Sequence, residues 1–186
     1  MGNEASTSIV KQRQDLLRAH YRSVAADARI TDCARTDSND APDAFHGTVV
    51  PGQAHGTTWR FGIHRAIGGY HDLPNPGDML CAALASCLDA TLRMIADRLG
   101  VEIQSLNVAV EADVDVRGCL MVDPNIPVGF QQMRCHVNLQ PGANADPAKL
   151  QILLATAERC CVVMQTLRNG VAVDARLAGP TSEAAE

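Results

Sequence analysis

The sequence predicts an α+β fold for this chain of 186 residues. Two long stretches rich in Ala and Leu have helical periodicity, and several shorter stretches alternate apolar with polar residues as strands do. The helical and strand-like stretches do not alternate regularly along the chain, which argues against a doubly wound parallel sheet. We therefore expect antiparallel sheets packed against two long central helices.

Residues 8–26 predict an amphipathic helix that packs either across the domain or against a partner subunit. Its apolar positions are Ile9, Leu16, Leu17, Tyr21 and Val24. We expect this helix to form an N-terminal extension over residues 1–27, followed by the main domain over residues 28–178. Residues 179–186 are expected to be a flexible tail.

Residues 28–69 predict three strands in a meander. The strand-like segments ARITDCART, AFHGTVV and TTWRFGIHRAI contain β-branched or aromatic residues, and the turn-forming segments SNDAPD and PGQAHG separate them.

Residues 75–100 predict the first long helix, around which the rest of the chain is arranged. Asn75 or Gly77 can cap its start, Asp78 puts negative charge in the first turn, and a glycine closes the stretch. The side opposite its apolar face carries Asp89, Arg93 and Asp97. One broad apolar face is expected to carry Leu80, Leu84, Cys87, Thr91, Met94 and Ile95.

The remaining elements follow from the same two periods. Alternation predicts a strand over residues 106–116, a short strand with a proline-containing loop, and another strand over residues 133–139. Asp146 caps a second long helix that runs to about Arg168, and a last strand starts near Val171 and Val173. The inward positions of the second helix are Leu150, Leu153, Leu154, Ala157, Cys160 or Cys161, and Met164.

Composition excludes several classes of function. Hydrophobic residues make up 46% of the chain and charged residues 20%, as in ordinary soluble domains. Aromatic residues reach only 3% and the net charge is -5, which argues against nucleic-acid binding. We see neither a membrane-spanning apolar run nor the apolar core of a signal peptide, so we expect a cytoplasmic protein without a membrane partner.

Seven cysteines are the most unusual feature of the composition. They are Cys33, Cys81, Cys87, Cys119, Cys135, Cys160 and Cys161. Because no CxxC pair is present, a zinc ribbon is not expected, and a cytoplasmic setting argues against a disulfide framework. We interpret Cys33, Cys119 and Cys135 as small buried residues. If the two long helices pack side by side, Cys87 approaches Cys160 or Cys161, and periodicity does not choose between these two.

Two motifs resemble the OsmC/Ohr family of osmotically inducible and organic-hydroperoxide-resistance proteins. PNPGDMLCAALASCLDATLRMIADRLGV is similar to the central helix with the reactive Cys, and AERCCVVMQTLRNGVAV is similar to the second helix, where a Cys-Pro-Val segment carries the partner Cys. DVDVRGCL resembles the strand between them. The resemblance covers roughly residues 28–177 and puts Cys161 at the partner position, with Cys160 as the fallback.

The resemblance implies an intertwined homodimer that acts as a thiol-dependent peroxidase in oxidative stress defence. A thiolate at Cys87 would attack an organic hydroperoxide and become a sulfenic acid, which Cys161 would convert to a disulfide. A dithiol reductant, lipoyl or a small thiol, would restore both thiols. This chemistry requires no cofactor and no metal.

Some residues depart from the family pattern. The hydroperoxide-resistance branch holds an Arg from an early strand with a Glu at the start of the central helix. Arg35 matches the Arg, with Arg65 as a rival cation, whereas the Glu position holds Gly77 and Asp78 follows it. Val162 stands where the family has Pro.

These departures keep two alternatives open. One is a non-catalytic OsmC-like dimer that senses redox state or binds a small ligand. The other is a metal-binding protein that uses His64 and His71 with Cys81 or Cys87, although these residues have no recognised ligand spacing.

Overall fold

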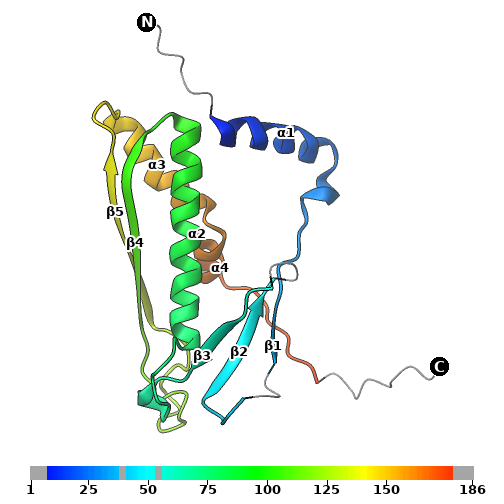
Figure 1. Ribbon diagram of the computed structural model, residues 1–186, viewed down its shortest axis with the longest axis vertical. Helices are drawn as coiled ribbons and strands as arrows, with labels where there is room; N and C mark the ends of the chain where they lie inside the picture. Colours follow the sequence, from blue (N-terminus) through cyan, green and yellow to red (C-terminus); the bar gives the residue numbers. More distant parts are fainter. Residues whose placement is uncertain (1–7, 38–40, 53–55, 178–186) are drawn as a thin grey trace, which may run out of the picture.

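The computed structural model describes residues 8–37, 41–52 and 56–177, and in these ranges the chain forms an α+β fold with antiparallel sheets (Figure 1). The predicted tail, residues 179–186, lies outside the described residues. The helices are α1 (Ile9–Ser23), α2 (Pro76–Leu99), α3 (Pro147–Cys160) and α4 (Val162–Asn169), with short 3-10 helices η1 (Ala25–Ala28) and η2 (Arg65–Ile67). The strands are β1 (Ala34–Asp37), β2 (His46–Pro51), β3 (Trp59–Gly62), β4 (Ile103–Asp113) and β5 (Gln132–Pro141).

The central helix α2 has the predicted ends. The Asn75 side chain accepts hydrogen bonds from the backbone N–H groups of Gly77 and Asp78, and the Asp78 carboxylate accepts from the Asn75 backbone N–H. This reciprocal pair is a capping box, which satisfies N–H groups that have no partner within the helix. Gly100 ends the helix with a positive φ of 65°, a conformation that glycine adopts without steric cost.

The buried face of α2 differs from the predicted one. Leu88 and Leu92 are each only 1% exposed, whereas Met94, expected to face inward, is 39% exposed. The observed face is rotated from the expected one by roughly a fifth of a turn. The rotation arises because the β4–β5 sheet and α3 cover only one side of α2, as Figure 1 shows. The buried residues of α2 are Leu84, Leu88, Thr91, Leu92 and Ala96.

Strands β4 and β5 form a long antiparallel ribbon whose apolar side faces α2. Val108 pairs with Val137, and Val110 pairs with Cys135. These residues alternate with exposed polar ones, as the sequence predicts. However, β4 ends at Asp113, and the short strand expected after it is absent from residues 114–131.

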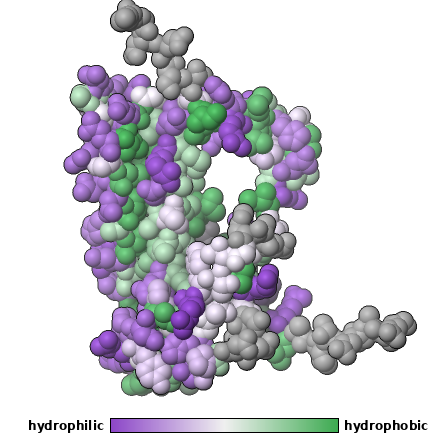
Figure 2. All heavy atoms as spheres, viewed as in Figure 1, coloured by the Kyte–Doolittle hydropathy of each residue, from purple (hydrophilic) through white to green (hydrophobic). Residues whose placement is uncertain are grey.

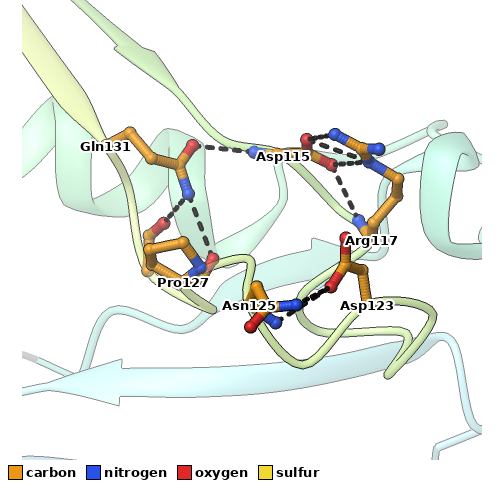
Figure 3. Close-up of polar contacts among 7 residues, drawn as sticks. Asp115, Arg117, Asp123, Asn125, Pro127 and Gln131 are labelled. Atoms are coloured by element: carbon orange, nitrogen blue, oxygen red, sulfur yellow. Dashed lines mark hydrogen bonds and ion pairs between the residues drawn. The ribbon is translucent and has the colours of Figure 1, made fainter.

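Residues 114–131 instead form an ordered loop tied together by side chains (Figure 3). The Gln131 side chain accepts a hydrogen bond from the Asp115 backbone N–H at 2.8 Å and donates to the Pro127 carbonyl at 3.1 Å. The Arg117 guanidinium pairs with the Asp115 carboxylate and lowers its pKa to about 2. These side-chain contacts compete with strand pairing. Gln131 also donates to the Gly129 carbonyl, which fixes the backbone beside Phe130, whose ring lies near the start of α2.

The second long helix is broken where the sequence predicts one continuous helix. It consists of α3 and α4, which meet at Cys161 and differ in direction by 61°. Cys161 has φ -71° and ψ 105°, an extended conformation that interrupts the helix. The expected last strand at Val171 and Val173 is also absent, since both residues are exposed and outside any strand.

The N-terminal part contains the predicted helix and the predicted three-stranded meander. The strands are shorter than expected, because residues 28–33 and 63–67 lie outside them. The sheet adjoins the start of α2, where the Gly62 N–H donates to the Pro74 carbonyl at 3.0 Å, while α1 crosses the other end of α2 (Figure 1).

Candidate functional site: the Cys87–Cys161 thiol pair

Two cysteines from different helices meet in the core. Cys87 lies in the middle of α2, is half-buried, and packs against the core cluster to which Cys161 belongs. Cys161 lies at the break between α3 and α4 and is 0% exposed. Both are free thiols, and they lie close enough to interact directly.

Local structure fixes both thiols. In α2, the buried Thr91 hydroxyl donates to the Cys87 carbonyl at 2.7 Å. Thr91 therefore has a hydrogen-bond partner in the backbone and leaves the Cys87 thiol free. At the break, the Cys161 N–H donates to the Ala157 carbonyl, and the Gln165 N–H donates to the Cys161 carbonyl, each at 2.9 Å. The broken helix therefore keeps its backbone hydrogen bonds while turning the Cys161 side chain toward α2.

The surroundings of Cys161 favour its protonated form. Burial is the largest cause that raises its pKa, a backbone hydrogen bond with Met164 is the next largest and lowers it, and the neighbouring Cys87 thiol raises it further. A thiol whose pKa is raised above 9.0 stays protonated at neutral pH. Cys161 therefore suits a thiol that reacts second, and half-buried Cys87 is the one that a substrate can reach.

The other cysteines divide between surface and core. Cys160, the fallback partner, is exposed at the end of α3. Cys33 and Cys119 are also exposed, so the prediction that they are buried is wrong. Both cysteines lie in segments that the sequence predicts as strands but that form no strand in the structure, so their side chains are not turned toward a core. Cys135 is half-buried on β5, and burial is the main cause that raises its pKa.

The predicted cations do not lie beside the thiol pair within one chain. Arg35 is exposed on β1, opposite Val50 on β2, and its side chain has no hydrogen bond or ion pair with another described residue. Arg65 is exposed in η2. Asp78, the possible acid partner, serves the capping box instead. The described part of one chain therefore contains no Arg–acid network at Cys87.

Phe130 explains why the acid position holds glycine. A Cβ atom at Gly77 would lie 3.0 Å from the Phe130 ring and 2.8 Å from the Asn75 side-chain oxygen. A glutamate therefore has no room at this position while the 114–131 loop keeps its conformation. Sequence analysis does not single out Phe130, although it is one of only three phenylalanines in the chain.

A cavity of about 790 Å³ lies between α2, β5, α3 and α4. Its wall includes Met164, which follows Cys161 in α4, but neither Cys87 nor Cys161. Its polar rim contains Arg168, which donates to the Glu158 carboxylate at 3.2 Å. The apolar lining includes Leu80, Leu84, Leu88, Phe130, Met133 and Val137.

The histidines of the alternative metal site lie away from the central thiols. The rings of His64 and His71 meet edge to face with centroids 4.3 Å apart, in the exposed loop between β3 and α2. Within the described ranges, no three His, Cys, Asp or Glu residues are grouped so that they could hold a metal ion.

These observations define a class: an α+β thiol protein with one cysteine in a long central helix and a second at the break of the helix beside it. Solved structures share its fold. An OsmC-like protein from Mycoplasma pneumoniae matches with a TM-score of 0.60 and 13% identity over 76% of this chain and 89% of that chain.

Two further structures are organic hydroperoxide resistance proteins by their descriptions. The one from Legionella pneumophila has a TM-score of 0.56 and 17% identity over 75% of this chain and 90% of its own. The one from Elizabethkingia anophelis has a TM-score of 0.57 and 16% identity over 76% and 91%. A search of curated proteins finds no match.

The family model for OsmC-like proteins matches residues 69–176, and the chain belongs to this family. The match confirms the resemblance and the fold predicted from the two cysteine motifs. By length and composition alone α2 could cross a bilayer, but one such helix is weak evidence for a membrane protein, because the core helix of a soluble protein passes the same test.

Proposed function

We propose that this protein is a thiol-dependent peroxidase that reduces organic hydroperoxides through Cys87 and Cys161. The observation that carries the proposal is the contact between the two thiols in the core. Family membership supports the same chemistry, because similar folds are described as organic hydroperoxide resistance proteins.

The reaction needs only the two thiols and the peroxide. The Cys87 thiolate attacks the outer peroxide oxygen, the O–O bond breaks, and the departing alkoxide takes a proton and leaves as an alcohol. Cys87 is then a sulfenic acid. The Cys161 sulfur attacks the Cys87 sulfur, the S–S bond forms, and the hydroxyl leaves with the Cys161 proton as water.

The two thiols together supply the two electrons that reduce the peroxide. A dithiol reductant, lipoyl or a small thiol, then restores both cysteines by thiol–disulfide exchange. The raised pKa of Cys161 fits its place as the second thiol, since it condenses with a sulfenic acid and need not attack the peroxide.

A homodimer is part of this proposal. Several large apolar side chains of the described residues are uncovered in one chain, among them Ile30 at 80% and Met121 at 88% exposure. Exposed apolar surface of this kind is typical of an interface. A second copy also offers a second β1, from which Arg35 can serve a thiol pair that it does not reach within its own chain.

Mass spectrometry of peroxide-treated protein tests the proposal. We expect fully reduced protein, treated with one equivalent of cumene hydroperoxide and digested without reduction, to yield a peptide pair joined through Cys87 and Cys161. The bond should be absent from Cys87→Ser and Cys161→Ser but present in Cys160→Ser, the matched control. Seven free thiols beside unreacted peroxide would overturn the peroxidase proposal.

A second candidate, a non-catalytic dimer that senses redox state or binds a small ligand, is favoured by two observations. No described cation contacts Cys87 within one chain. The wall of the cavity contains neither Cys87 nor Cys161, so a ligand could bind there without meeting the thiols. A thiol that oxidises only with excess peroxide, without turnover by a dithiol, would support this candidate over the first.

A further inference from the structure

Helix α1 lies outside the matched family region and is attached to the rest of the chain by polar contacts. The Asp97 carboxylate, near the end of α2, accepts hydrogen bonds from the Ser8 hydroxyl and from the Val10 N–H. Arg98 donates to the Asp15 carboxylate at 2.8 Å and to the Gln14 side-chain oxygen at 3.3 Å. These contacts hold the first two turns of α1 against the last two turns of α2.

The apolar face of α1 continues beyond this attachment. Gln14 contacts the Met94 sulfur of α2 at 3.6 Å, so its side of α1 is the inner one. At 100° per residue, Leu17 and Tyr21 lie on that same side. Val24 follows directly as the C-cap of α1. They extend past α2, and Leu17 remains 47% exposed and Val24 41% exposed.

This uncovered face borders an opening in the molecule. After α1 and η1 the chain runs through residues 29–33 to β1, away from α2 (Figure 1). The space-filling view shows open space between α1, the segment that follows it and α2 (Figure 2). Ile30, in the segment that borders the opening, is 80% exposed, and Met94 on α2 is 39% exposed.

The facing surface of α2 indicates what fills the opening. Its most apolar window has a mean hydropathy of 1.6, yet only 28% of that window is buried within one chain. Exposed apolar surface of this kind is typical of an interface between subunits. A second copy, which carries the same apolar helix, presents a complementary surface.

We propose that a second copy of this chain occupies the opening and that α1 closes over it as a clasp, with Leu17, Tyr21 and Val24 in contact with that copy. The inference rests on the proposed homodimer and assigns the N-terminal extension a task within it. The polar attachment to Asp97 and Arg98 sets the position of the clasp, and its apolar second half supplies the contact.

Sedimentation velocity over a concentration series tests the clasp in the full-length, reduced protein. The test variant is the double substitution Leu17→Ser with Val24→Ser. The matched control is Ile9→Ser with Leu16→Ser. These side chains lie roughly 140–160° around the helix axis from Gln14, against roughly 60° for Leu17. They are 59% and 75% exposed. We expect the dimer dissociation constant to rise at least about tenfold in the test variant and by less than about twofold in the control.

The outcomes separate the clasp from the homodimer and from the peroxidase. Equal dissociation constants for the two double variants would overturn the clasp alone, whereas a wild-type chain that stays monomeric would overturn the homodimer as well. Peroxide turnover, measured separately, decides the peroxidase proposal. Hydrogen exchange provides a check without substitutions: amides of residues 17–23 should exchange more slowly in the dimer than after dilution to the monomer, and equal rates would also overturn the clasp.

Discussion

The two halves of this chain differ in how far they are complete on their own. Among the described residues, every buried apolar residue of the core lies between positions 84 and 164. Helix α1 has no buried residue, and Arg35 in the N-terminal sheet is exposed. The difference teaches that packing within one chain positions the two thiols, whereas the described N-terminal residues contribute no buried apolar residue to that packing.

Stability measurements sharpen this comparison most strongly. Leu88→Ala, which removes a side chain that is 1% exposed, should lower the free energy of unfolding by about 2–5 kcal/mol. Leu16→Ala, at a position that is 75% exposed on α1, should change it by less than about 0.5 kcal/mol. Urea titration of both variants measures the two values, and similar losses would show that α1 packs as tightly as α2.

The start of α2 offers a second test within the packed half. Gly77→Ala should cost about 1–3 kcal/mol, because its Cβ atom would press on the Phe130 ring and on the Asn75 cap. The cost should fall when Phe130 is also changed to Ala, since the ring is one of the two obstacles. A double-mutant cycle measures this coupling, and strictly additive costs would contradict the steric explanation.

Arg35 tests the incomplete half through activity. If Arg35 reaches Cys87 from a second copy, Arg35→Ala should lower turnover of cumene hydroperoxide by about tenfold or more, because a nearby cation favours the thiolate. Arg60→Ala is the matched control, since it removes another exposed arginine of the N-terminal sheet, from β3. Equal activities of the two variants would remove Arg35 from the proposed site.

The smallest expected effect is a pH dependence in the N-terminal half. Hydrogen bonding to Asp72 at 3.1 Å is the main cause that raises the pKa of His46, and Asp43 adds to it. The stabilisation is fully present below the ordinary value of 6.5 and is lost as pH rises through the higher folded-state pKa. His46→Gln should therefore flatten the pH dependence of the urea midpoint between about pH 6 and 8. Superimposable profiles would rule out this role.

Sequence periodicity predicted the elements of the packed half better than their orientation. It located α2, β4 and β5 and brought Cys87 near Cys160 or Cys161, and the family resemblance chose Cys161. It did not predict which side of α2 is buried, because Leu88 and Leu92 are as apolar as the residues of the expected face. Only the positions of the sheet and of α3 decide between these sides.

The sequence pattern did not predict features that depend on contacts between distant parts of the chain. The break at Cys161 has no glycine or proline to mark it, and apolar residues continue through it in helical phase. The separation of Arg35 from Cys87 follows from how the N-terminal sheet is placed, which no local motif records. The resemblance implied a site of two cysteines and an arginine. Folding within one chain brings only the two cysteines together.

The break at Cys161 also bears on how the family motif can vary. The extended backbone of Cys161 is the conformation that a residue before proline must adopt, and Val162 stands at the first position of α4, where proline is tolerated. The main chain is therefore already shaped for the Cys-Pro form, although proline is absent. The Cys-Val and Cys-Pro forms of the motif can therefore share one backbone conformation at this break.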